Sequence, residues 1–179
     1  MTLAAQYDLK VIFPLVADYN ILVNNPDSVI QQFLMNQIDE VGNFSNLLMW
    51  NFGNELPLTD DLITRMNGLM DFIRNYTYTK WNRFVPVTVA VVDDPHTYDH
   101  LVAALKVDVF STNAGYRGLN FQDLWSGAAT PGFSGMNNLT QRYNKPVFIS
   151  EIGWHNFNNT INTAIPGKIN SFEELLIFS

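Results

Sequence analysis

Five apolar runs are spaced along the chain, and segments with helical spacing separate them. The runs cover residues 11–16, 47–52, 85–92, 107–111 and 146–150. Uninterrupted apolar runs of this length are typical of strands that are buried on both faces of a parallel sheet. The pattern therefore predicts an α/β protein in which helices alternate with parallel strands.

The segments between the runs predict the helices. A turn at residues 25–28 opens a helix that reaches about residue 41, and Thr59 precedes a helix over residues 60–76. A short helix is expected over residues 98–105. The region 121–143 is expected to be helical on both sides of a Gly-rich loop at residues 131–135.

Polar and aromatic residues follow the apolar runs. They are Asp18 and Tyr19, Asn54 and Glu55, Asp93, Asp94 and His96, Asn113, Tyr116 and Arg117, and Glu151, Trp154 and His155. Functional side chains gather at the carboxyl ends of all strands in a (β/α)8 barrel, whereas a doubly wound sheet collects them at one crevice. No Gly-rich phosphate turn follows a strand. We therefore expect a (β/α)8 TIM barrel rather than a nucleotide-binding sheet, and one that is incomplete, because only about five strands are present.

Composition narrows the class of partner. The 179 residues suit a single domain over 1–179, and 47% of them are hydrophobic. The net charge of −7 argues against nucleic acid and against an anionic membrane surface. The chain has no Cys and no apolar run of membrane-spanning length, and residues 1–8 lack the basic and apolar regions expected of a signal peptide. Four Asn-X-Ser/Thr sequons support secretion only weakly, so the compartment is not decided.

Two of the runs end in a glutamate. Residues 47–55 end in Gly53-Asn54-Glu55, and residues 145–151 end in Ser150-Glu151. A single such Glu is explained as well by a helix cap or by a salt bridge at the rim of the sheet. Two strands that each place one Glu at the same rim predict a carboxyl pair, as glycoside hydrolysis requires.

The two motifs resemble those of the clan A retaining glycoside hydrolases. Residues 50–55 (WNFGNE) resemble the fourth strand of that clan, where Asn-Glu carries the acid/base, and residues 145–153 (KPVFISEIG) resemble the seventh strand, which carries the nucleophile. Residues 107–116 (VDVFSTNAGY) resemble the sixth strand, which often supplies a Tyr beside the nucleophile. The segment 150–154 is similar to members that act on β-1,3-glucans, and the Lys-Pro-Val opening is similar to family 2 β-glycosidases.

The resemblance implies a role for each residue. Glu55 is the expected general acid/base and Glu151 the expected nucleophile of a double displacement at a β-glycosidic bond. Asn54 is expected to bind the sugar 2-hydroxyl, and Tyr116 to donate to Glu151. The further substrate-binding candidates at the strand ends are Trp154, Asp18, Tyr19, His96 and Asn113. The expected partner is an oligo- or polysaccharide, and no cofactor is implied.

Three alternatives remain open. His96 and His100, with Asp93 and Asp94, have a spacing that would let two His share a helical face and bind a metal, although His96 suits a surface position or a hydrogen bond to substrate equally well. A carbohydrate-binding or degenerate hydrolase domain would keep both glutamates without performing the chemistry. A β-glucan transglycosylase would use the same residues and exclude water from the glycosyl-enzyme.

The resemblance covers the third to the seventh strand of the eight-stranded barrel. We therefore expect the chain to be a fragment whose first and last strands, residues 10–16 and 146–150, form open edges. On its own it is expected to be poorly soluble and weakly active or inactive, and the remainder of the barrel would be its missing partner.

Overall fold

The computed structural model describes residues 1–16, 18–114, 121–127, 131–152, 157–158 and 163–164. Its main sheet has five strands, and a short second sheet lies near the carboxyl end of the chain. The strands are β1 (Val11–Val16), β2 (Leu47–Asn54), β3 (Val87–Val91), β4 (Phe110–Ala114), β5 (Val147–Ile152), β6 (Phe157–Asn158) and β7 (Thr163–Ala164).

The main sheet is parallel and follows chain order, β1-β2-β3-β4-β5. Neighbouring strands joined by a helical crossover, with no reversal of order, give the arrangement of consecutive strands in a (β/α)8 barrel. The two outer strands, β1 and β5, are the edges of this open sheet. The expected incomplete barrel of about five strands is therefore confirmed.

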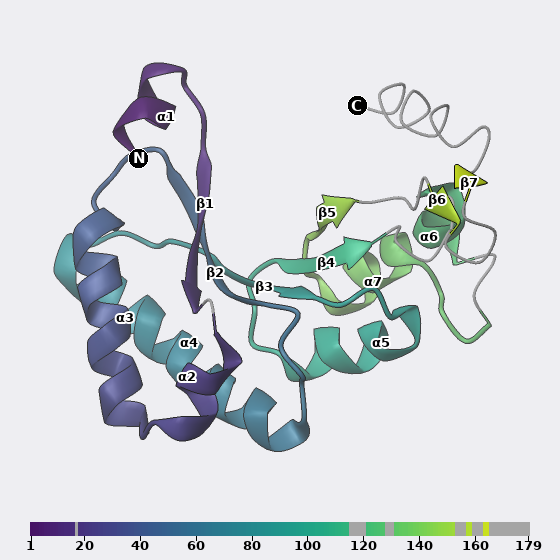
Figure 1. The fold of residues 1–179 in the computed structure, drawn as a ribbon, viewed down its shortest axis with the longest axis horizontal. Coiled ribbons are helices and arrows are strands. Elements are labelled where there is room, and N and C mark those ends of the chain that lie inside the picture. Colours follow the sequence, from purple (N-terminus) through teal and green to yellow (C-terminus); the bar gives the residue numbers. More distant parts are fainter. Residues whose placement is uncertain (17, 115–120, 128–130, 153–156, 159–162, 165–179) are drawn as a thin grey trace.

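The longer helices connect successive strands. Figure 1 shows α3, α4 and α5 gathered on one side of the bent sheet. The helices are α1 (Thr2–Gln6), α2 (Tyr19–Asn24), α3 (Asp27–Val41), α4 (Asp60–Trp81), α5 (Pro95–Ala104), α6 (Phe121–Ser126) and α7 (Met136–Tyr143). None of the helices in the described ranges is both long and apolar enough to cross a membrane.

The helix-facing side of the sheet is apolar. Phe13 and Trp50 are partners in the β1–β2 register, and their rings pack edge to face with centroids 6.1 Å apart. Trp50 and Phe52 are fully buried and belong to one continuous core with residues of α3 and α4. Because side chains alternate along a strand, every second residue of each apolar run lies on this face.

The opposite face of the sheet is mixed in polarity. Register places Pro14, Asn51, Thr88, Ala90, Ser111 and Phe148 on this face. In a closed barrel such a face lines the packed interior. Here Pro14 is exposed and Phe148 is partly buried, whereas Thr88 and Ser111 in the middle of the sheet are buried.

Helix α4 has the apolar face and the N-cap that its sequence predicts. Leu62, Met66, Leu69 and Ile73 are all buried and recur at the spacing of one helical face. The Thr59 side chain accepts a hydrogen bond from the Leu62 amide at 3.3 Å and caps the first turn. The helix continues to Trp81, five residues beyond the predicted end, and Asn82 adopts the left-handed conformation at its C-cap.

Other boundaries also differ from the prediction. The fourth strand begins at Phe110 rather than at residue 107, because the Asp108 carboxylate accepts hydrogen bonds from the Val87 amide at 2.8 Å and from Arg74 Nε at 3.0 Å. Helix α5, which precedes this strand, begins at Pro95, three residues earlier than expected. Proline is favoured at a first helical position because its missing N–H would have no partner there.

Candidate active site

The candidate active site lies at the carboxyl ends of β2, β4 and β5. Glu55 directly follows β2, whereas Asn113 and Glu151 are near the ends of β4 and β5. These strands belong to one parallel sheet, so their carboxyl ends meet at the same rim. Asn54, Glu55 and Glu151 are exposed, and Asn113 is completely buried.

A bulge at the end of β2 aims Asn54 and Glu55. Asn51 pairs with Thr88 and Asn54 pairs with Ala90, so three steps along β2 match two steps along β3. An extra residue of this kind bends the strand and redirects the side chains that follow it. The bulge contains Gly53, against which the buried side chain of Leu56 packs.

Glu55 has an unusual backbone conformation. Its φ is 48°, in the left-handed region that non-glycine residues adopt at an energetic cost. Its amide donates a hydrogen bond of 2.8 Å to the Ala90 carbonyl on β3, which holds the turn in place. Strain of this kind is found where the surrounding structure fixes a functional side chain.

Asn113 connects Glu55 to β5. Its Nδ2 atom donates hydrogen bonds of 3.0 Å to Asn54 Oδ1 and 3.0 Å to Glu55 Oε1. Its Oδ1 atom accepts a hydrogen bond of 2.8 Å from the Ser150 hydroxyl. The buried amide therefore uses both of its ends and ties three strands together at the rim.

Glu151 lies opposite Asn113. The two residues are partners in the β4–β5 register, whereas the preceding pair is Thr112 with Ile149, so Ser150 is the extra residue of a second bulge. Adjacent strands lie about 4.8 Å apart. The backbone of Glu151 is therefore next to that of the residue whose side chain contacts Glu55.

Buried hydroxyl groups support this arrangement on β3 and β4. The Thr88 hydroxyl donates to Ser111 Oγ at 2.9 Å, and the Ser111 hydroxyl donates to the Val89 carbonyl at 2.9 Å. Ser150, Thr88 and Ser111 were not among the residues predicted from the sequence. Of the three, only Ser150 could have been suspected from the sequence, since it stands beside Glu151. The contacts of Thr88 and Ser111 depend on which strands become neighbours in the sheet.

Two groups on the helix side stabilise the strands that carry the site. The Tyr98 hydroxyl is 2.7 Å from Thr112 Oγ1 and 3.3 Å from the Asp93 carboxylate, and burial raises the pKa of Tyr98 above its usual value. Lys145 donates hydrogen bonds of 2.7 Å to the Val102 and Leu105 carbonyls at the end of α5. Burial lowers the pKa of Lys145. The negative charge of Asp108 acts to raise this pKa, and the positive charge of Arg74 acts to lower it.

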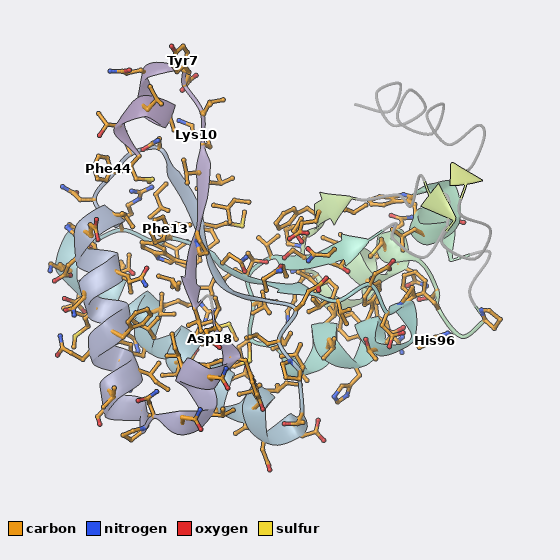
Figure 2. The ribbon with its side chains drawn as sticks, viewed as in Figure 1. Tyr7, Lys10, Phe13, Asp18, Phe44 and His96 are labelled. Carbon is orange, nitrogen blue, oxygen red and sulfur yellow. The ribbon has the colours of Figure 1, made fainter. Side chains whose placement is uncertain are left out.

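Asp18 and Tyr19, which were predicted to form the polar exit of the first strand, begin helix α2. The Asp18 carboxylate accepts a hydrogen bond of 2.8 Å from the Asn20 amide and caps α2. Tyr19 is the first residue of this helix, and 37% of it is exposed. Asp18 lies beside the carboxyl end of β1, well apart from His96 in Figure 2.

His96 is exposed on the first turn of α5. Its neighbour on that helix, His100, contacts the Asp60 carboxylate at 3.2 Å. Within the described ranges, no group of three or more His, Asp or Glu side chains is arranged to hold a metal ion. Tyr116 and Trp154, the other two predicted substrate-binding residues, lie outside the described residues.

Residues 1–172 match the glycoside hydrolase family 72 profile, which is described as glucanosyltransferase. The chain belongs to the glucanosyltransferase family. The resemblance to retaining clan A glycoside hydrolases is therefore confirmed at the level of the family. No individually curated protein matches the chain at significant similarity.

Solved structures of glycoside hydrolases share the fold. Saccharomyces cerevisiae Gas2p in complex with laminaritriose and laminaritetraose is 25% identical, with a TM-score of 0.60 over 88% of this chain. Gas2p in complex with laminaripentaose is 26% identical, with a TM-score of 0.59 over 88% of this chain. A glycosyl hydrolase family 2 member from Bacteroides cellulosilyticus is 18% identical, with a TM-score of 0.55 over 84% of this chain.

The matched region is only part of each of these proteins. It spans 38% and 37% of the two Gas2p chains, and 18% of the family 2 chain. This glucanosyltransferase-family chain thus corresponds to a five-stranded section of the larger structures that it resembles.

Proposed function

We propose that this chain carries the two catalytic carboxyl groups of a retaining β-glucan transglycosylase, with Glu55 as general acid/base and Glu151 as nucleophile. One observation carries the proposal: Asn113 contacts the Glu55 carboxylate with its side chain and is the register partner of Glu151 with its backbone. Both glutamates therefore lie at the same rim of the sheet and are linked through Asn113 on β4. Both are exposed, as groups that meet a polysaccharide must be.

The first step forms a glycosyl-enzyme. A Glu151 carboxylate oxygen attacks the anomeric carbon and forms a C–O bond, while the bond from that carbon to the glycosidic oxygen breaks. The departing oxygen takes the proton of the Glu55 carboxyl group, so the released sugar leaves as an alcohol and Glu55 becomes a carboxylate.

The second step reverses the first with a new acceptor. The Glu55 carboxylate removes a proton from a hydroxyl group of an incoming glucan, and that oxygen attacks the anomeric carbon as Glu151 leaves. The configuration is retained because the carbon is inverted twice. With water as the acceptor, the same residues perform hydrolysis, so exclusion of water distinguishes the two outcomes.

The proposed substrate is a β-1,3-linked glucan. The laminari-oligosaccharides bound in the Gas2p structures are of this class, and Gas2p is about a quarter identical to this chain. Asn54, beside the acid/base, is the proposed contact of the sugar 2-hydroxyl. Asp18, Tyr19, His96, Tyr116 and Trp154 remain candidates for holding the sugar chain. Asn113, predicted as a further contact, is completely buried, so its proposed role is to act through Asn54 and Glu55.

Mechanism-based labelling tests the proposal. A 2-fluoro laminari-oligosaccharyl fluoride should label Glu151 covalently, and peptide mapping by mass spectrometry should find one sugar on that residue. Glu151→Gln should abolish the label. The label in Glu55→Ala should still form, because fluoride needs no proton to leave. Reversible sugar binding without any label would instead favour the carbohydrate-binding alternative, and a label on another residue would overturn the assignment of Glu151.

A further inference from the structure

The Asn113 side chain has only one satisfactory orientation in its surroundings. Its neighbours are a carboxylate oxygen of Glu55, the amide oxygen of Asn54 and the hydroxyl of Ser150. An ionised carboxylate accepts hydrogen bonds and cannot donate them, whereas a hydroxyl can do both. When Glu55 is ionised, as it is between the two steps of the proposed reaction, the NH2 group must therefore face Glu55 and Asn54, and the carbonyl oxygen must face Ser150.

This orientation determines which atoms of Asn54 and Glu55 are available to a ligand. The oxygen of the Asn54 amide is already engaged by Asn113, which leaves its NH2 group to donate to a sugar hydroxyl. Glu55 Oε1 is likewise engaged, and an oxygen that accepts from an amide is a poor place for the acidic proton. The proton is therefore directed to Oε2.

We infer that Asn113 is a positioning residue that fixes Glu55 with Oε2 as its proton-transferring oxygen and Asn54 with its NH2 group toward substrate. This inference rests on the proposed function, because it assigns an atom within the acid/base step. Asn113 is well suited to this task, since it is completely buried and its carbonyl oxygen is held by Ser150 on the next strand. Its hydrogen bond to Glu55 is of the stronger, charge-assisted kind when that carboxyl group is ionised.

A nuclear magnetic resonance titration tests the contact without requiring turnover. In the ¹H–¹⁵N spectrum of the full chain, the Asn113 side-chain NH2 resonances should shift as Glu55 loses its proton with rising pH. The shift should disappear in Glu55→Gln, which keeps the shape and removes the ionisation. It should persist in Glu151→Gln, the matched control on β5, which removes a carboxyl group that is not the partner of the Asn113 NH2 group. Resonances that do not titrate, or that titrate unchanged in Glu55→Gln, would overturn the inference.

Kinetics test the consequence for proton transfer. Asn113→Asp keeps the size of the side chain and an acceptor for Ser150, but it removes both donors. For an unactivated laminari-oligosaccharide, which needs the acid, kcat/KM should fall about a hundredfold, and for a strongly activated aryl glucoside it should stay within about threefold. Unchanged values, or equal losses on both substrates, would contradict a role that acts through Glu55.

The two tests separate this inference from the proposed function. If Glu151 is labelled by the fluorosugar and Asn113→Asp behaves as the unmodified chain does, the function stands and the positioning role fails. If the Asn113 resonances follow Glu55 and no residue is labelled, the contact stands and the function fails. Cooperative unfolding of Asn113→Asp is checked first, and Ser150→Ala, which leaves both donors in place, serves as a second variant with a milder expected loss on the unactivated substrate.

Discussion

The Leu56 side chain occupies the space into which a side chain at Gly53 would project. A Cβ atom at position 53 would lie 2.5 Å from Leu56 Cδ1 and 3.1 Å from Leu56 Cγ. Leu56 is buried, so it has little room to move aside. Since Glu55 lies between these two residues, the contact helps to determine where the proposed acid/base is held.

We expect Gly53→Ala to destabilise the fold and to displace Glu55. Overpacking of a filled site typically costs about 1–3 kcal/mol in the free energy of unfolding. Gly68→Ala is the matched control, because a Cβ atom there meets nothing within 4 Å and alanine favours its helix by up to about 1 kcal/mol. Urea unfolding measures both variants. Equal stability of the two would show that the Gly53–Leu56 contact does not matter.

The left-handed conformation of Glu55 predicts that an Asn at this position is more stable than a Gln. Asn tolerates this conformation better than Glu or Gln does, so Glu55→Asn should unfold at higher urea than Glu55→Gln, by about 1 kcal/mol. Both variants should lose transfer to laminari-oligosaccharides, because neither can donate an acidic proton. An Asn variant no more stable than the Gln variant would mean that position 55 carries no backbone strain.

Burial of Tyr98 predicts a loss of stability at alkaline pH. The pKa of Tyr98 is raised in the folded state, so the unfolded chain loses its proton first, once the pH passes about 10. The folded state binds more protons in that range, and the free energy of unfolding therefore falls as pH rises. Below about pH 10 Tyr98 is protonated in both states, so its contribution to the free energy of unfolding is fully present.

Tyr98→Phe separates this effect from the titration of other groups. The variant should be less stable near neutral pH by about 1–2 kcal/mol, because Thr112 and Asp93 lose a hydrogen-bond partner. Its stability should nevertheless fall less steeply above pH 10 than that of the unmodified chain. Parallel curves for the two proteins in a series of urea unfolding experiments would contradict the assignment.

Much of the architecture follows from the sequence alone. The apolar runs predict the five strands because each must be buried on its helix-facing side, as Trp50 and Phe52 are. The edges at β1 and β5 and the order of the sheet agree with the prediction. Helix α2 was missed because its six residues are too short to show a periodic pattern, although Asp18 at its N-cap was visible as a potential signal.

The candidate site was predictable in its residue types but not in its contacts. Glu55 and Glu151 are recognisable because each follows an apolar strand. The bulges at Gly53 and Ser150 are properties of the pairing between strands, and no local pattern in one strand determines them. The hydrogen bond from Asn113 to Glu55 joins residues 58 positions apart, so it appears only once β2 and β4 share a rim.

The separation of the two proposed catalytic carboxyl groups tests the central claim most directly. A crystal structure of the chain with a bound laminari-oligosaccharide would measure it between the carboxyl groups of Glu55 and Glu151. A retaining pair predicts about 5–5.5 Å, with the sugar's anomeric carbon facing Glu151. A separation beyond roughly 9 Å, with both strands in place, would contradict the double-displacement mechanism.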